Sequence, residues 1–111
     1  MGIIKKTHGD QRLYNDTQIT ISRLFLLLSH PGRVKLILLL VLYEDLSLGE
    51  IQEYLQLSQS ATSGLVKQIK QTGLITGREV GTSVRYSLDE EMWENVKGVI
   101  QYFLNEVNNL G

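Results

Sequence analysis

The stretch LSQSATSGLVKQIKQTGLI, residues 57–75, carries the side chains of this chain best suited to recognition chemistry. Placed at 100° steps on a helix, Ser60, Ser63 and Lys67 share one side, and Ile69 lies on the opposite side. Hydroxyls can donate to or accept from base edges and phosphates, and a lysine neutralises phosphate charge. The polar side of such a helix is therefore chemically suited to nucleic acid.

An ordinary solvent-exposed face is the alternative interpretation, and it is the commoner use of an amphipathic helix. A helix that only meets water favours Glu, Lys and Ala. Here the polar side has no acidic residue, and Gly64 costs the helix about 1 kcal/mol relative to alanine. These two features favour a surface with a partner.

Charge along the chain supports the same view. Residues 57–88 contain one acidic residue, Glu79, and four basic residues: Lys67, Lys70, Arg78 and Arg85. Acidic residues gather before and after this segment, at Glu44 to Glu53 and at Asp89 to Glu94. Such segregation suits a one-sided surface for a polyanion, although it also arises by chance.

The elements that position this stretch follow from periodicity and capping signals. We predict a helix-rich fold with helices over about 15–29, 31–43, 47–55, 58–72 and 89–110, and a hairpin over 74–88. Ser47 and Glu50 have the spacing of a capping box, and Gly73 suits the left-handed residue that ends a helix. Only Gln56-Leu57 separates the third and fourth helices, which predicts a helix-turn-helix.

Composition bounds the class of protein. The chain has 111 residues, a net charge of −1, 42% hydrophobic and 21% charged residues, and no cysteine. We expect one globular domain over 15–111, preceded by an N-terminal arm over 1–14. The apolar runs are too short to span a bilayer, and no export signal opens the chain, so we expect a cytoplasmic protein without a membrane partner.

The first and last helices carry more apolar surface than one small core needs. The first is apolar nearly all round, and the last, over 89–110, has apolar residues at alternating three- and four-residue steps, the spacing of helices that pack lengthwise. We predict that both helices form a dimer interface, with these residues: Leu24, Leu28, Trp93, Val96, Ile100, Phe103 and Val107.

Three motifs over about residues 20–105 resemble the ArsR family of winged-helix repressors. LSHPGRVKLILLL is similar to the start of the family's second helix, LSQSATSGLVKQIKQTGLI to its recognition segment, and GREVGTSVRYSL to its wing. The resemblance implies five helices with a two-stranded wing, a homodimer joined through the first and last helices, and an inverted-repeat operator in double-stranded DNA. It implies DNA contacts, and the full predicted set is Gln59, Ser60, Ser63, Gly64, Lys67, Lys70, Arg78, Thr82 and Arg85.

Two departures from the family pattern stand out. The family's typical recognition-helix arginine falls at Gly64. The Cys-x-Cys of metal-sensing members falls at Ser47 and Gly49 within DLSLGEI, so a soft-metal sensor of that design is excluded. The histidines, His8 and His30, are isolated, and we predict no metal, cofactor or catalytic residue.

The leading hypothesis is therefore a homodimeric, sequence-specific DNA-binding regulator, a repressor that occludes a promoter and does not sense metals through cysteines. The alternative is a winged-helix module that docks onto another protein. An enzyme ranks third because no catalytic arrangement is evident. The sequence does not identify an effector.

Overall fold

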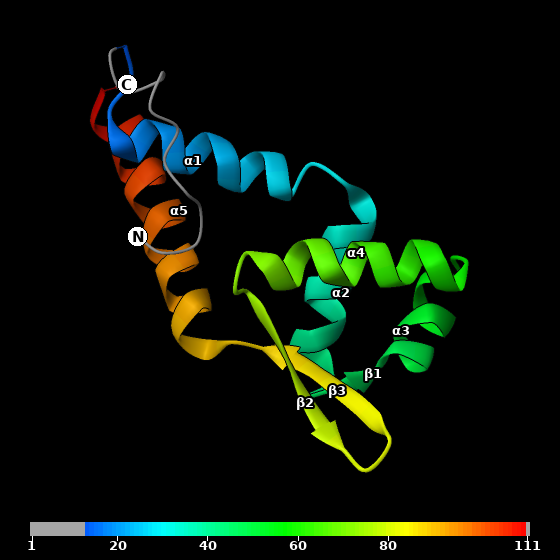
Figure 1. Cartoon of the computed structure of the whole chain (residues 1–111). Helices are drawn as coiled ribbons and strands as arrows, with labels where there is room; N and C mark the ends of the chain where they lie inside the picture. Colours follow the sequence, from blue (N-terminus) through cyan, green and yellow to red (C-terminus); the bar gives the residue numbers. More distant parts are fainter. Residues whose placement is uncertain (1–12, 111) are drawn as a thin grey trace.

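The computed structural model describes residues 13–110, and five helices and one antiparallel sheet lie among them. In chain order the elements are α1 (Asp16–Leu27), α2 (Pro31–Leu42), β1 (Leu46–Ser47), α3 (Leu48–Leu55), α4 (Gln59–Gln71), β2 (Ile75–Val80), β3 (Ser83–Leu88) and α5 (Glu90–Leu110) (Figure 1). This confirms the predicted fold class, a mostly helical winged helix-turn-helix. Residues 1–12 of the predicted arm lie outside the described residues.

Local capping explains where the helices begin. Asn15 Oδ1 accepts from the Gln18 N–H at 2.8 Å, and Gln18 Oε1 accepts from the Asn15 N–H at 3.0 Å, a capping box at the start of α1. The predicted box of Ser47 and Glu50 starts α3, with distances of 3.2 and 2.9 Å. Each box satisfies backbone donors that a helix leaves unpaired in its first turn.

The helix-turn-helix itself forms as predicted. Gln56 ends α3 with φ 55°, and the side chain of Ser58 caps α4 by accepting from the Ala61 N–H at 3.1 Å. Beyond α4, Gly73 adopts φ 83°, the left-handed conformation that glycine takes at low cost. The chain then enters β2.

The sheet has three strands rather than the two expected. β2 and β3 form the wing, and Gly81 with φ 63° lies in the turn between them. The third strand, β1, pairs antiparallel with β3 and sets Leu46 opposite Tyr86 and Ser47 opposite Arg85. A two-residue strand has too little alternation to be recognised from its sequence.

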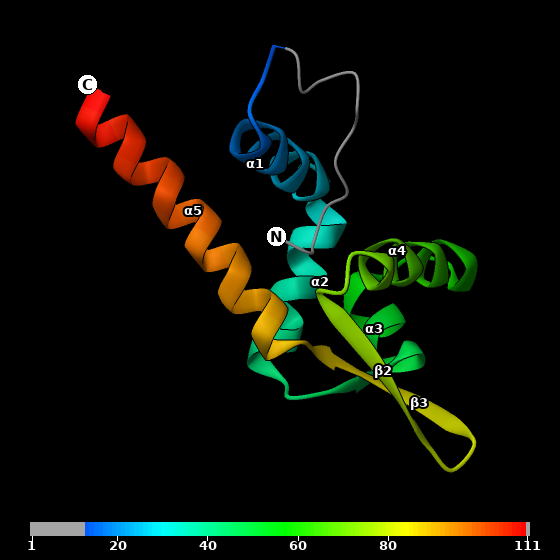
Figure 2. The ribbon, with the colours of Figure 1, turned by 60° about the vertical axis from the view of Figure 1, so that its left-hand side comes forward.

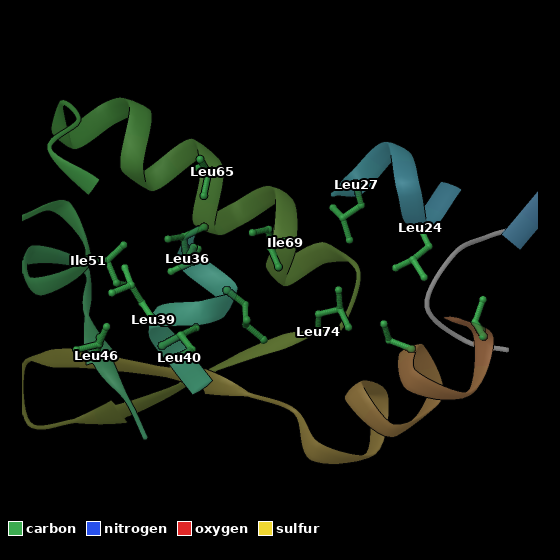
Figure 3. Packing of buried hydrophobic residues seen from close by; sticks show 14 residues of the cluster. Leu24, Leu27, Leu36, Leu39, Leu40, Leu46, Ile51, Leu65, Ile69 and Leu74 are labelled. Atoms are coloured by element: carbon green, nitrogen blue, oxygen red, sulfur yellow. The ribbon is translucent and has the colours of Figure 1, made fainter. Parts of the chain in front are cut away.

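A single apolar core holds the helix-turn-helix on the rest of the chain. Leu36 and Leu39 of α2, Ile51 of α3, and Leu65 and Ile69 of α4 meet in it (Figure 3). Each fully buried side chain of this size contributes about 1.5–3 kcal/mol of burial free energy. The orientation of α4 is therefore fixed by packing, not only by the turn.

The long helix α5 packs against this core with its first half and extends beyond it with its second half. Val96 and Val99 in its first half are buried, whereas Leu104, Val107 and Leu110 further along are exposed. Its C-terminal end lies at the opposite end of the molecule from the wing, and the chain extends over 49 × 28 × 24 Å (Figure 2). The radius of gyration, 15.7 Å, exceeds the roughly 13 Å expected for a compact domain of this length.

No single helix within residues 13–110 is both long and apolar enough to cross a membrane. α1 and α2 reach that apolar content only together, and they are bent by 90° at the break between them.

Candidate nucleic-acid interface

The two faces of α4 are those predicted from its sequence. The inner face is buried and consists of Thr62, Leu65, Val66 and Ile69. The buried Thr62 hydroxyl donates to the Ser58 carbonyl at 2.8 Å, so it leaves no unsatisfied group in the core. The outer face is exposed and carries six of the predicted residues: Gln59, Ser60, Ser63, Gly64, Lys67 and Lys70.

The start of α4 borders a shallow hollow. Its volume is about 520 Å³, and it is lined by Leu48 of α3 and by Ser58, Gln59, Ser60 and Ser63. Apart from Leu48, every lining side chain is a hydroxyl or an amide. Such groups can hydrogen-bond to base edges or phosphate oxygens.

Gly64 lies in the middle of α4, and packing within the chain does not require it there. A Cβ built on Gly64 would meet no atom of the described residues within 4 Å. Alanine would favour the helix by about 1 kcal/mol at such a position. The glycine thus leaves a gap in the side chains of the outer face, between Ser60 and Lys67.

The lysines of the outer face are free to meet a polyanion. Lys67 and Lys70 are exposed, and neither takes part in an ion pair with any residue from 13 to 110. No acidic residue lies on α4. The outer face is therefore positively charged and otherwise neutral.

The wing contributes a second polar surface. The side chain of Arg78 on β2 is 73% exposed, and Thr82 is exposed in the turn after Gly81. Arg78 approaches Asp45 at 3.6 Å, a distance at which an exposed pair contributes little stability. These side chains can reach a partner without losing a strong contact.

Arg85, which the sequence placed in the DNA-binding set, is engaged within the chain. Its guanidinium donates to Asp45 Oδ1 at 2.6 and 2.9 Å and to Glu50 Oε1 at 2.6 Å. The two carboxylates raise the pKa of Arg85, Asp45 having the larger effect. Asp45 and Glu50 precede the basic segment in sequence but contact Arg85 in space, so the predicted separation of acidic from basic side chains is wrong for these two residues.

The residues predicted for self-association separate into two groups. Leu24 and Val96 are 2% and 0% exposed in the chain's own core, so neither is available to a second copy; this part of the prediction is corrected. The apolar spacing did not distinguish them, because α1 is apolar nearly all round and the apolar side of α5 is wider than one stripe. The others are partly buried or exposed: Leu28, Trp93, Ile100, Phe103 and Val107.

Other apolar side chains on α1 and α5 were missed. Phe25, Leu26 and Leu104 are 43%, 68% and 49% exposed. The ring of Phe25 meets that of Phe103 edge-on, with centroids 5.5 Å apart, so α1 and α5 present one shared apolar surface. The four- and three-residue steps from Ile100 to Leu104 and on to Val107 would have placed Leu104 on the same apolar side of α5.

A separate apolar stripe lies on α2. Val34, Leu38, Val41 and Leu42 are 36–72% exposed. Val41 also lines a hollow with Trp93 at the start of α5, and most of the other side chains that line this hollow are polar or charged. Periodicity does not indicate which side of this helix is exposed, because residues 36–42 are all apolar.

No cluster of metal-binding side chains occurs among the residues that the structure describes. His30 caps α2, its Nδ1 accepting from the Gly32 N–H at 3.0 Å. His8 lies outside the described range. The chain as a whole has no cysteine.

Comparison with known proteins gives structural matches only. No protein-family model matches the chain, and no curated protein matches it in sequence. Rv0081 from Mycobacterium tuberculosis matches with a TM-score of 0.66 and 24% identity, over 86% of this chain and 96% of that one. HlyU from Vibrio vulnificus, described as a transcriptional regulator, matches with a TM-score of 0.59 and 28% identity, over 78% of this chain and 90% of that one.

A third match concerns assembly. The fragment of Mb0332 from Mycobacterium bovis is described as a homodimeric winged helix-turn-helix DNA-binding domain of a possible ArsR-family regulator. It matches with a TM-score of 0.62 and 17% identity, over 93% of this chain and 91% of that one.

Proposed function

We propose that this chain is not an enzyme but a transcriptional regulator, and that it binds a specific sequence of double-stranded DNA as a homodimer. Its winged helix-turn-helix fold, shared with a possible ArsR-family regulator, supports the proposal. The observation that carries the proposal is the outer face of α4, which combines hydroxyls, amides and two lysines that have no ion pair within residues 13–110, with no acidic side chain on the helix. A face of this chemistry matches both base edges and phosphates.

In the proposed complex, α4 enters the major groove. Gln59, Ser60 and Ser63 lie near its N-terminal end and are placed to hydrogen-bond to bases, while Lys67 and Lys70 meet phosphates. Arg78 and Thr82 of the wing contact the backbone beside the groove. Lacking a long side chain at Gly64, α4 can approach the groove wall closely.

A homodimer follows from the apolar surface shared by α1 and α5. Phe25, Leu26, Leu104 and Val107 are too exposed for a chain that stays alone in water, and a second copy would cover them. A two-fold dimer presents two α4 helices, so the operator would be an inverted repeat.

Repression by occluding a promoter is the simplest use of such a dimer, because the bound protein covers the DNA that a polymerase needs. We place the protein in the cytoplasm on the strength of this function. Sensing of a soft metal by a Cys-x-Cys pair plays no part, since Ser47 and Gly49 occupy those positions.

Selection of binding sites from random duplex DNA tests the proposal. We expect the full chain to enrich one sequence with inverted-repeat symmetry. Docking of the α4 face onto another protein is the competing function, and it predicts no enriched sequence together with a stable protein complex that Lys67→Glu disrupts. That pair of results would refute DNA recognition.

A further inference from the structure

Arg85 lies where the wing meets the helix-turn-helix. It is on β3, opposite Ser47 of β1 on one side and opposite Arg78 of β2 on the other. Its side chain is 30% exposed, much less than the 73% of Arg78. Two arginines opposite each other on adjacent strands repel, and the carboxylate of Asp45 offsets this repulsion.

The guanidinium of Arg85 has all three nitrogens in use. Nε and Nη2 both donate to Asp45 Oδ1, Nη2 also donates to the Asp45 carbonyl at 3.2 Å, and Nη1 donates to Glu50 Oε1. Asp45 belongs to the segment between α2 and β1, and Glu50 to the first turn of α3. One side chain therefore connects β3 to two other parts of the fold.

The side chain of Glu50 is also held by a hydrogen bond that does not involve Arg85. The same oxygen, Oε1, accepts from the Ser47 backbone N–H at 2.9 Å as part of the capping box. This backbone hydrogen bond is the main cause of the lowered pKa of Glu50, and Arg85 lowers it further. The first turn of α3 thus offers Arg85 a rigid anchor, and α3 leads directly into α4 through the turn at Gln56.

A direct DNA contact by Arg85 would break this arrangement. Turning its guanidinium toward a phosphate would leave Glu50 without an ion pair among residues 13–110, and Asp45 with only the 3.6 Å approach of Arg78. Negative charge that Arg85 now offsets would then lie close to the DNA backbone. The loss of short, charge-assisted hydrogen bonds would add to the free-energy cost of a direct contact. The side chain of Arg78 is exposed, and its one ion-pair partner among residues 13–110 lies 3.6 Å away, so Arg78 can reach a phosphate at far lower cost.

We propose that Arg85 is a positioning residue: through Asp45 and Glu50 it fixes the wing relative to α3 and α4, so that both surfaces meet one DNA duplex, and it does not contact DNA itself. Arg78 is the arginine of the wing that binds phosphate. This inference rests on the proposed DNA-binding function and specifies how the wing takes part in it.

The test measures affinity for the selected duplex by fluorescence anisotropy over a range of salt concentrations, with the parent and three variants. Each phosphate contact adds about 0.9 to the slope of log K against log salt. Arg78→Gln should lower the slope by about 1.8 for a dimer, since two contacts are lost. Arg85→Gln should weaken binding at least tenfold and leave the slope unchanged.

Asp45→Asn gives the sharpest distinction. If Arg85 bound DNA, removing this negative charge would free the arginine and strengthen binding. Positioning predicts the opposite, a loss of at least tenfold, although the protein becomes less negative. Glu44→Gln is the matched control: it removes one charge from the neighbouring exposed residue, which has no partner within residues 13–110, and binding should not weaken.

Circular dichroism must show each variant folded at the assay temperature. A slope lowered by Arg85→Gln as much as by Arg78→Gln, or stronger binding by Asp45→Asn, overturns the positioning role while leaving DNA binding intact. Absence of binding by the parent refutes the proposed function instead, so the two failures are distinguishable.

Discussion

Replacing Gly64 by alanine should stabilise the protein and at the same time weaken its binding to DNA. The new Cβ meets no atom of residues 13–110 within 4 Å in the free protein, so it brings helix propensity without steric cost. Glycine to alanine in a helix interior favours folding by about 0.8–1 kcal/mol, which corresponds to a rise in Tm of roughly 3–4 °C for a chain of this length. In the complex the added methyl would crowd the groove wall.

Crowding of a packed interface costs about 1–3 kcal/mol for each extra group. Two copies in a dimer therefore weaken DNA binding at least tenfold, since 1.4 kcal/mol is a factor of ten. Gly98→Ala is the matched control: Gly98 lies within α5, its Cβ would also meet no atom within 4 Å, and it is not in the predicted DNA-binding set. It should raise Tm equally without changing affinity.

Calorimetry and anisotropy on the same preparations check both effects. A fall in Tm for Gly64→Ala would contradict the claim that the space around Gly64 can hold a Cβ. A higher Tm with unchanged affinity would refute the close approach of α4 to DNA.

Three further predictions concern assembly and stability. Leu104→Glu should weaken dimer association at least tenfold, measured by analytical ultracentrifugation. Val80→Glu on the wing, at the same 49% exposure, should leave the dimer unchanged. A dimer that persists in Leu104→Glu would exclude the α5 surface as the dimer interface. Gly73→Ala should destabilise the fold by about 1–2 kcal/mol in urea, because φ is 83° and Met92 Cε would lie 3.2 Å from the new Cβ; an unchanged midpoint would contradict this. Because the pKa of Glu50 is lowered in the folded protein, its carboxylate contributes its full stabilisation above the ordinary glutamate pKa and loses it as pH falls through the lowered value. The urea midpoint of the parent should therefore decrease below about pH 4. The decrease should be smaller in Glu50→Gln.

Features that depend on near neighbours in sequence were predictable. The caps at Asn15, Ser47 and Ser58 and the left-handed Gly73 each rest on a few consecutive residues. The two faces of α4 follow from helical periodicity alone. The placement of the candidate DNA-binding side chains on one exposed face was therefore accessible from sequence.

Features that depend on distant segments were not predictable. Arg85 finds Asp45 across 40 positions of sequence, and nothing local indicates which of several acidic residues folds back onto the wing. Periodicity identified apolar stripes on α1 and α5 but could not say that Leu24 and Val96 face the chain's own core. It was equally silent on α2, where residues 36–42 are all apolar and only the fold decides that Leu38, Val41 and Leu42 are exposed.

Titration of the selected duplex with the parent and with Lys67→Gln at several salt concentrations tests the central claim, that the outer face of α4 binds DNA. Lys67 has no ion pair within the described residues, so its removal should lower the slope of log K against log salt by about 1.8 for a dimer, at unchanged stability. Lys35→Gln, an exposed lysine on α2, should leave the slope as it is. Equal slopes for the parent and Lys67→Gln would contradict the account.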